Sequence, residues 1–435
     1  MEISPARVTA LDILLTAERG GYVGEILKAE LKKNEKLEKE DRAFLTRLVE
    51  GVTERRITLD QLVDHFSKTP VKKLHPVIRE SLRMGAYQLI FMDHVPDYAV
   101  INEAVELVKR KKLGKLTGFV NAILHKIAAW KNSGQAEISL MEWINKTPER
   151  KYSTPDWICR RLKQAYGKEK AEMILEDQFR EKPLSLRVNR TKISGADVLK
   201  LLLENGFTAE AGALSKQAVR VMNAENPAEL PGWKEGLFSV QDESSMLAIE
   251  AAEIKPGDRV LDLCAAPGGK STYAAELSGN RVIARDISAE KLKKIEENAE
   301  RLGLDIEVRA GDAAEFVPEF AGTADLVICD VPCSGLGVIG KKNDIKYRLD
   351  PKNPANLAKL SSEILDTAAR YVKPGGKLLF STCTILPAEN GEAAEAFRER
   401  HPEYKLLQER QLLQGIDPCD GFFFSVMQKE ESRKE

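Results

Sequence analysis

Apolar residues in the first third of the chain recur at the spacing of an α-helix. Stripes of three or more such residues lie within segments 8–15, 44–52, 59–66, 101–108 and 120–127. No run of strand-like alternation interrupts them, and a stripe of this period marks the buried face of an amphipathic helix. The pattern therefore predicts a compact all-α bundle over residues 1–140.

The pattern changes in the last part of the chain, where short apolar runs of strand length alternate with helical segments. The predicted strands are 259–265, 281–287, 306–310, 324–330 and 377–383. The predicted helices lie near 270–277, 288–302, 355–371 and 388–400. This order is typical of an α/β domain with a mostly parallel sheet. A last strand, 421–427, is expected to add antiparallel at the edge of that sheet.

The middle of the chain reads as a small α+β module. Residues 183–190 alternate with period two, which predicts a strand with its leucines inward and with Arg187 and Asn189 outward. A helix ending near Gly206 and a second strand at 218–222 follow. The expected fold class is multidomain: an all-α bundle (1–140), a linker with an α+β module (141–235), and a Rossmann-like α/β domain (236–435).

Composition narrows the class of protein. The chain has 435 residues, of which 43% are hydrophobic, and it contains no run of 18 apolar residues, so a membrane span is not expected. The N-terminus lacks the features of a signal peptide. Six scattered cysteines form no CxxC pair, which speaks against a disulfide scaffold or a zinc site. We expect a cytoplasmic protein with no membrane or metal partner, and a monomer is favoured.

Positive charge is concentrated in the middle of the chain. Residues 101–200 hold 21 Lys+Arg and 12 Asp+Glu, whereas residues 201–435 hold 29 and 39. This asymmetry favours a polyanionic partner such as RNA, although solvated helix faces or a helix C-terminus also collect lysines. The α+β module could equally be a spacer. The candidate RNA contacts are Lys109, Arg110, Lys111, Lys112, Lys115, Arg160, Arg161, Arg187 and Arg190.

A candidate nucleoside site begins at residues 259–270, RVLDLCAAPGGK. A buried strand, a glycine turn and a helix N-terminus follow one another there, so a ligand could approach the backbone closely. Asp286 ends the next predicted strand eighteen residues after Gly268, where a carboxylate can accept from both hydroxyls of a ribose. Asp286 could instead cap the following helix. Asp312 follows the third strand in the same way.

Two cysteines follow neighbouring strands of the predicted sheet. Asp330-Val331-Pro332-Cys333 ends one strand, and Thr382-Cys383 ends the next. Both thiols should therefore lie at the carboxyl edge, beside the nucleoside site. Each cysteine alone is more often a small buried hydrophobic residue. Together they fit methylation of a pyrimidine at C5, which requires a thiolate to add at C6. Asp330 could supply the acid near N3, and spacing alone does not order the two cysteines.

The motifs LDLCAAPGGKS, DVPCSGLGV, NDIKY and STCTILPAEN resemble those of the RNA cytosine-5 methyltransferases. The helical region, with GFVNAIL at 118–124, resembles the antitermination factor NusB. This combination is similar to the Sun/Fmu family, and the resemblance covers nearly the whole chain. Departures from the family pattern are small: Thr384 replaces serine, Val331 replaces alanine, Asn343 replaces proline, and Arg285 lies beside the ribose carboxylate, where it bears on cofactor affinity.

The resemblance implies a methyltransferase that uses S-adenosyl-L-methionine and modifies an unpaired or flipped cytosine of 16S rRNA. It implies that Cys383 is the nucleophile and that Cys333 assists release of the product. It also implies a set of cofactor-binding residues: Cys264, Ala265, Ala266, Pro267, Gly268, Gly269, Lys270, Asp286, Asp312 and Asp330. A tRNA substrate, or a non-catalytic ribosome-assembly or antitermination factor, remain the alternatives.

Overall fold

The computed structural model of the chain describes residues 4–34, 37–133, 138–222, 224, 226–279 and 281–431. The chain forms two compact units. Unit 1 comprises Met1–Arg161 with Ile339–Arg348, and unit 2 comprises Leu162–Val338 with Leu349–Glu435. The first three residues of the N-terminal segment lie outside the described part.

Unit 1 is helical, as its apolar spacing predicts. The stripes point into one core, in which Leu11, Leu48, Leu62, Val108 and Ile127 have no exposed surface. The helices are α1 (Pro5–Arg19), α2 (Val23–Lys33), α3 (Lys39–Glu54), α4 (Arg56–Phe66), α5 (Pro76–Phe91), α6 (Asp97–Arg110), α7 (Thr117–Lys131), α8 (Leu140–Asn145), α9 (Pro148–Lys151) and the first part of α10 (Asp156–Asp177), which breaks at Gly167.

Unit 1 also contains a segment from far along the chain, residues 339–348, which ends in the short helix α15 (Ile345–Arg348). Asp344 Oδ2 accepts a hydrogen bond from the backbone N–H of Val23 at 3.2 Å, at the start of α2. Lys346 Nζ donates to the carbonyl of Glu54 at 3.1 Å, and burial lowers the pKa of Lys346 to about 7. The NDIKY motif is therefore part of the helical unit, which its sequence position does not predict.

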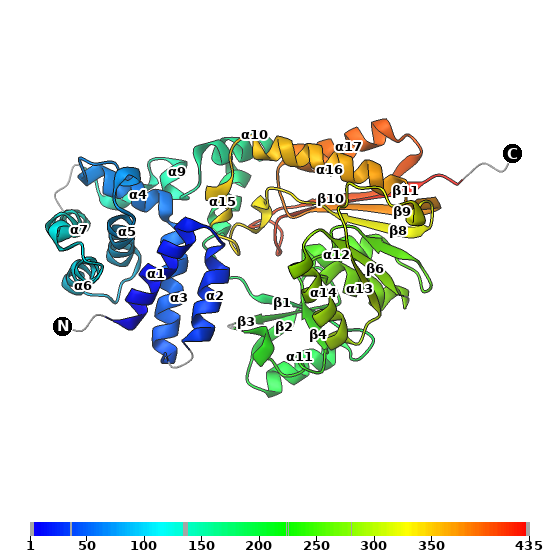
Figure 1. Ribbon diagram of the computed structural model, residues 1–435, viewed down its shortest axis with the longest axis horizontal. Helices are drawn as coiled ribbons and strands as arrows, with labels where there is room; N and C mark the ends of the chain where they lie inside the picture. The colour runs from blue at the N-terminus through cyan, green and yellow to red at the C-terminus, as the bar shows by residue number, and fades with distance from the viewer. Residues whose placement is uncertain are drawn as a thin grey trace. The chain divides into compact units, whose positions relative to one another are not determined.

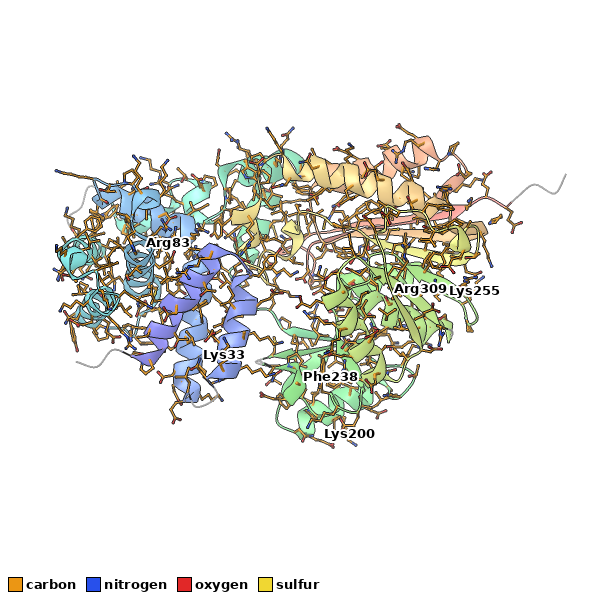
Figure 2. All side chains as sticks on the ribbon, viewed as in Figure 1. Lys33, Arg83, Lys200, Phe238, Lys255 and Arg309 are labelled. Atoms are coloured by element: carbon orange, nitrogen blue, oxygen red, sulfur yellow. The ribbon has the colours of Figure 1, made fainter. Side chains whose placement is uncertain are left out.

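The small module of unit 2 is an antiparallel four-stranded sheet in the order β2-β3-β1-β4. Its elements are β1 (Leu184–Val188), α11 (Gly195–Glu204), β2 (Thr208–Ala211), β3 (Ala218–Met222) and β4 (Phe238–Val240). Leu186, Val198, Val221 and Phe238 form its core, and Phe238 is labelled in Figure 2. The predicted strands near 184–188 and 218–222 are confirmed, whereas β2 and β4 are too short to show a pattern.

The predicted orientation of Arg187 and Asn189 is wrong, because both side chains are fully buried. The second face of β1 is covered by α13 (Gly269–Ser278) rather than by solvent. Arg187 Nη2 forms a 2.7 Å ion pair with Glu276, and it also donates to Thr272 Oγ1 at 3.0 Å. Arg187 is therefore not available to RNA. It fastens the small sheet to α13.

Replacing Arg187 with leucine is expected to destabilise α13 by about 3–5 kcal/mol, because Glu276 would stay buried without its cation. Native-state hydrogen exchange of the α13 amides measures this free energy. The matched control is Arg190→Leu, three residues away and exposed, which should change it by less than about 0.5 kcal/mol. Equal effects of the two substitutions would contradict the assignment.

The large sheet of unit 2 has seven strands in the order β10-β11-β9-β8-β5-β6-β7. Strands β9, β8, β5, β6 and β7 run parallel. Figure 1 shows α16 and α17 on one face of the sheet and α12, α13 and α14 on the other. The elements are α12 (Glu243–Ala251), β5 (Val260–Asp262), β6 (Val282–Asp286), α14 (Ala289–Leu302), β7 (Ile306–Ala310), β8 (Ala324–Asp330), α16 (Asn353–Ala369), β9 (Val372–Thr382), α17 (Gly391–Arg400), β10 (Tyr404–Leu412) and β11 (Phe422–Lys429).

This arrangement confirms the Rossmann-like fold class but corrects one edge of the sheet. Strand β11 is antiparallel as predicted, yet β10 pairs with its outer side and forms the edge instead. Strand β10 escapes prediction because residues 405–410 are all exposed and largely polar, so no buried alternation marks them. Within the described part of the chain, every helix is too short or too polar to serve as a membrane span.

Candidate active site

The glycine turn lies at the carboxyl edge of the large sheet. Strand β5 ends at Asp262, and α13 begins at Gly269 after the turn through Ala265, Ala266 and Pro267. Gly268 adopts a φ of 103°, in the left-handed region that favours glycine. A Cβ atom at Gly268 would lie 3.2 Å from Ile295 Cγ2, so a side chain there would crowd α14. The local geometry is the one that the sequence predicts.

Asp286 connects this turn to the neighbouring strand. Its Oδ2 accepts from the backbone N–H of Ala266 at 3.2 Å, and its Oδ1 accepts from the N–H of Ser288 at 3.0 Å. Ser288, and not Asp286, caps α14 through the N–H of Lys291. Each carboxylate oxygen has a second lone pair, so Asp286 can still accept from a ligand hydroxyl.

The predicted carboxylates gather around Cys264. Burial first, and then the charges of Asp262, Asp330, Asp286 and Asp312, raise the pKa of the Cys264 thiol. Asp262, Asp286 and Asp330 are the last residues of strands β5, β6 and β8, and Asp312 follows the end of β7, so all four belong to the carboxyl edge of the sheet. Asp312 Oδ1 accepts from the N–H of Ala314 at 2.9 Å. The structure therefore brings the predicted cofactor-binding residues of three strands together.

Arg285 and Asp262 add detail that the sequence does not indicate. Arg285 is 4% exposed, and its Nη2 donates to the carbonyl of Asp312 at 3.3 Å, so it supports the strand end behind the carboxylates. Asp262 is fully buried and accepts from Ser271 Oγ at 2.6 Å. Burial raises the pKa of Asp262 to about 7. A charged residue inside an apolar strand is the one signal that could have marked Asp262.

Asp330 connects the turn to the two cysteine-bearing strands. Lys270 Nζ, on α13, lies 2.7 Å from Asp330 Oδ2. Ser381 Oγ, on β9, donates to Asp330 Oδ1 at 2.9 Å. The Asp330 side chain is 30% exposed, so a ligand can reach it. This carboxylate is held from both sides and still faces the open edge of the sheet.

The sulfur atoms of Cys333 and Cys383 lie 3.4 Å apart. Strands β8 and β9 pair in parallel, and each cysteine follows the end of its strand, so the two thiols meet as predicted. Both side chains are partly exposed. The hydrogen bond to Cys383 and burial raise the pKa of Cys333 well above its ordinary value. Either sulfur can donate in this hydrogen bond, so the geometry brings the two thiols together without assigning the proton to one of them.

The other four cysteines lie elsewhere, and none of the six, all within the described residues, forms a disulfide. Cys329 is fully buried in the strand before Asp330. The described ranges contain no group of three or more His, Cys, Asp or Glu side chains arranged to hold a metal ion.

The predicted RNA contacts are mostly on the surface, apart from Arg187. Lys109 and Arg110 are exposed at the end of α6, and Lys112 and Lys115 are exposed in the loop that follows. Lys109 pairs with Glu106, Lys111 with Asp12, and Arg160 with Asp156. Arg161 lies over the Trp157 ring, and Arg190 is exposed. Exposed ion pairs contribute little to stability, so these cations can exchange their partners for phosphates.

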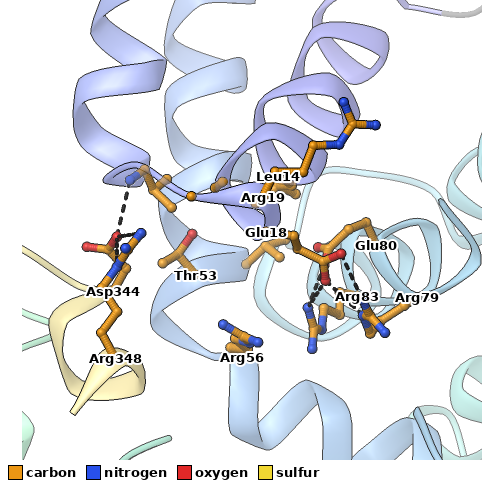
Figure 3. Close-up of a pocket in the computed structure, with 14 residues that line it drawn as sticks. Leu14, Glu18, Arg19, Thr53, Arg56, Arg79, Glu80, Arg83, Asp344 and Arg348 are labelled. Carbon is orange, nitrogen blue, oxygen red and sulfur yellow. Dashed lines mark hydrogen bonds and ion pairs between the residues drawn. The ribbon is translucent and has the colours of Figure 1, made fainter. Parts of the chain in front are cut away.

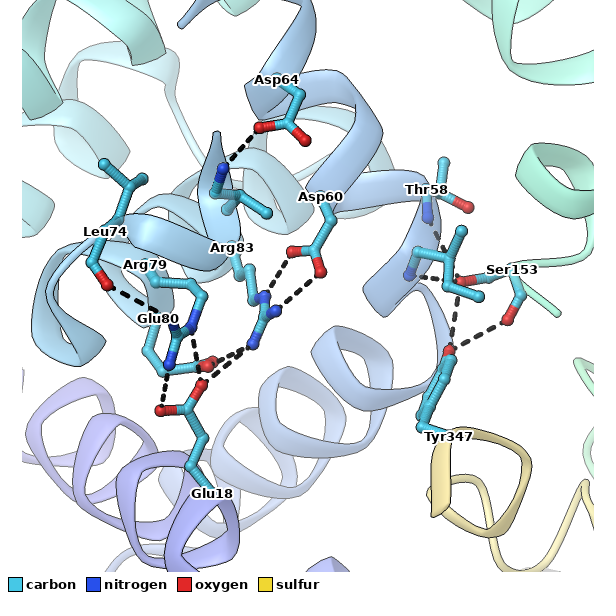
Figure 4. A network of polar contacts seen from close by, with 12 residues as sticks. Glu18, Thr58, Asp60, Asp64, Leu74, Arg79, Glu80, Arg83, Ser153 and Tyr347 are labelled. Atoms are coloured by element: carbon cyan, nitrogen blue, oxygen red, sulfur yellow. Dashed lines mark hydrogen bonds and ion pairs between the residues drawn. The ribbon is translucent and has the colours of Figure 1, made fainter. Parts of the chain in front are cut away.

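Unit 1 contains a pocket of about 400 Å³, shown in Figure 3. Five arginines line it, together with Glu18, Glu80 and Asp344. Figure 4 shows the ion pairs of two of these arginines, Arg79 and Arg83, with neighbouring carboxylates. Arg83 pairs with Asp60 at 2.6 Å and with Glu18 at 3.4 Å, and it also contacts Glu80. Arg79 pairs with Glu18 at 2.7 Å. These ion pairs join helices α1, α4 and α5 of the bundle, and we assign the pocket no ligand.

Comparison with known proteins connects this geometry to a family. The family model "16S rRNA methyltransferase RsmB/F" matches residues 249–425. The chain is 35% identical over 452 residues to the probable ribosomal RNA small subunit methyltransferase B of Bacillus subtilis (strain 168), covering 99% of this chain and 100% of that protein. The chain belongs to the RsmB/F family of 16S rRNA methyltransferases.

Further relatives and family models support the same family assignment. Ribosomal RNA small subunit methyltransferase B of Serratia proteamaculans (strain 568) is 33% identical over 97% of this chain and 98% of its own length. Models of the NusB family and of the RsmF/B-like ferredoxin-like domain match residues 4–129 and 154–227. The solved structure of PH0851 covers 99% of this chain and 100% of its own, with a TM-score of 0.83 and 26% identity. The family uses S-adenosylmethionine, which confirms the predicted cofactor.

Proposed function

We propose that this protein methylates C5 of one cytosine in 16S rRNA through a covalent bond between Cys383 and C6 of the base. The observation that carries the proposal is the 3.4 Å distance between the two sulfurs at the edge of the sheet that also bears the glycine turn. A site for binding alone needs no paired thiols.

The residues at the sheet edge fit S-adenosylmethionine. The turn from Cys264 to Lys270 offers backbone groups, and Asp286 and Asp312 offer carboxylates for hydroxyl and amino groups. Gly268 has the left-handed conformation that favours glycine, and it is buried against Ile295, so it sets the shape of the turn. Asp330 would close the site on the side of the cysteines. When bound, S-adenosylmethionine supplies a methyl group on a positively charged sulfur.

Cys383 is the nucleophile in this proposal, because the resemblance to the RNA cytosine-5 methyltransferases gives that role to the cysteine of the Thr-Cys motif, and Cys333 lies 3.4 Å from it. Its thiolate adds to C6 of cytosine, and the C5–C6 double-bond electrons move so that C5 becomes nucleophilic. After C5 gains the methyl group, a base removes the C5 proton and the C6–S bond breaks, which returns the thiolate. Cys333, at van der Waals distance, serves this release step.

Asp330 is proposed to act near N3 of the base. Negative charge develops on the base when the thiolate adds, and a proton donor stabilises it. The 2.7 Å contact between Lys270 Nζ and Asp330 Oδ2 provides a route for that proton. Ser381, which donates to the other oxygen, fixes the orientation of the carboxyl group.

The RNA is expected to contact the basic side chains on the surface of both units. Lys109, Arg110, Lys111, Lys112 and Lys115 in unit 1, and Arg160, Arg161 and Arg190 along the middle of the chain, can neutralise backbone phosphates. The cytosine must leave its stack to reach a thiol, which favours an unpaired or flipped base. We propose that the enzyme acts in the cytoplasm on ribosomal RNA.

The proposal is tested by supplying the purified full chain with methyl-labelled S-adenosylmethionine and 16S rRNA, and by bisulfite sequencing of RNA from cells with and without the gene. We expect label in 16S rRNA and one protected cytosine that disappears with the gene. Label in tRNA alone would favour the tRNA enzyme. No label in any RNA, despite binding, would favour the non-catalytic assembly factor.

A further inference from the structure

A buried carboxyl group joins the two loops that carry the cysteines. Glu389, in the short 3-10 helix Pro387–Glu389, accepts from the backbone N–H of Ser334 at 2.8 Å and from Ser334 Oγ at 2.5 Å. Ser334 Oγ lies 2.6 Å from Thr384 Oγ1, which also donates to Glu389 at 3.3 Å. Sequence reasoning did not single out Glu389. We call Ser334, Thr384 and Glu389 the Glu389 clasp.

The Glu389 clasp is placed where it controls the cysteines. Ser334 directly follows Cys333, and Thr384 directly follows Cys383. All three side chains of the clasp are at most 1% exposed. Burying a carboxyl group costs several kcal/mol unless donors satisfy it. The sequence could have packed an apolar residue at this position, but it keeps a carboxyl group whose donors come from both cysteine loops.

The two cysteines depend on the clasp to different degrees. Cys383 is also held by Asn390, whose Nδ2 donates to the Thr384 carbonyl at 3.0 Å and whose Oδ1 accepts from Thr382 Oγ1 at 2.5 Å. These contacts lie on both sides of Cys383 along the chain. On the Cys333 side, the adjacent Ser334 forms hydrogen bonds to Glu389 and Thr384 of the clasp. Loss of Glu389 should therefore loosen Cys333 more than Cys383.

We propose that Glu389 is a positioning residue that holds Cys333 against Cys383 for the release step. The inference rests on the proposed function, since it needs Cys383 as nucleophile and Cys333 as the residue that serves release. A displacement of about 1 Å in a reacting group can slow a step about 100-fold. Without Glu389, attack by Cys383 continues, and the step that depends on Cys333 becomes slow.

The test is a single-turnover reaction of the full chain with S-adenosylmethionine and 16S rRNA, in which covalent protein–RNA adduct and released methylated RNA are measured separately. For Glu389→Ala we expect release to slow about 10- to 100-fold, adduct to accumulate, and adduct formation to stay within about threefold of the wild-type rate. The control is Glu392→Ala, exposed on α17, which should behave as wild type.

A second pair of variants probes the clasp without removing the carboxyl group. Thr384→Ser keeps the hydroxyl and should release product at the wild-type rate. Thr384→Val has nearly the shape of threonine but no hydroxyl, and should accumulate adduct. S-adenosylmethionine binding shows that each variant is folded. If Glu389→Ala does not fold, the Thr384 pair decides the question.

Two results would overturn the inference. One is release at the wild-type rate by Glu389→Ala or, where that variant does not fold, by Thr384→Val. The other is an equal loss of attack and release, which would indicate a merely structural role. Failure of the proposed function looks different: Cys333→Ala would then release methylated RNA normally and form no adduct, whatever Glu389→Ala does.

Discussion

Cys383→Ala is expected to abolish methylation of 16S rRNA, with a loss of about four orders of magnitude or more in rate. The physical reason is that C5 of cytosine becomes nucleophilic only after a thiolate adds at C6, and no other group in the site can replace that thiolate. Transfer of labelled methyl groups to RNA measures the loss. Binding of S-adenosylmethionine should be unchanged, because Cys383 lies beyond the turn that would hold it.

Cys419→Ala is the matched control for this substitution. Cys419 is partly buried in the same unit, and like Cys383 it forms no disulfide. We expect this variant to methylate at the wild-type rate. Substantial activity in Cys383→Ala would exclude Cys383 as the nucleophile and would remove the covalent step.

Cys333→Ala is expected to trap a covalent protein–RNA adduct and to reduce turnover about 100-fold or more. Attack by Cys383 still occurs, but the residue that serves release is missing 3.4 Å from the bonded sulfur. The adduct is visible as a protein band of reduced mobility in a denaturing gel, and it should require both RNA and S-adenosylmethionine.

The double variant Cys333→Ala/Cys383→Ala separates this result from non-specific crosslinking, because it should form no adduct. Normal turnover by Cys333→Ala together with an adduct in Cys383→Ala would mean that the two roles are exchanged.

Local pattern predicted much of the fold. Strands β7 and β8 have the predicted bounds, 306–310 and 324–330. Strand β8 is an apolar run that is buried along most of its length, whereas β7 is half-buried and alternates between apolar and charged residues. Strand β10 was not predicted because residues 405–410 are all exposed, so they show no alternation of buried and exposed positions. The error at Arg187 has the opposite cause. A charged side chain in an alternating strand reads as outward, and only the tertiary contact with Glu276 shows that both faces are covered.

In the site, too, local pattern predicted some features, and tertiary contacts determined the others. The carboxyl-edge rule for parallel strands was enough to expect that Cys333 and Cys383 meet, and they do. It could not order them, because both cysteines follow the ends of neighbouring strands in the same way. Nothing in the sequence pattern indicated Glu389 either. Its hydrogen-bond partners are Ser334, 55 positions away along the chain, and Thr384, five positions away, and no periodic pattern predicts such contacts.

The excursion of residues 339–348 into unit 1 limits how the chain can be divided. A fragment starting at residue 162 would retain Lys346 but lose Glu54, whose carbonyl accepts from its ammonium group. It would also lose Ser153, 3.2 Å from the Tyr347 hydroxyl. In such a fragment, residues 339–348 would lose the helices of unit 1 against which they pack. This segment begins only six positions after Cys333. A fragment of unit 2 that is to be active therefore has to be supplied together with residues 1–161.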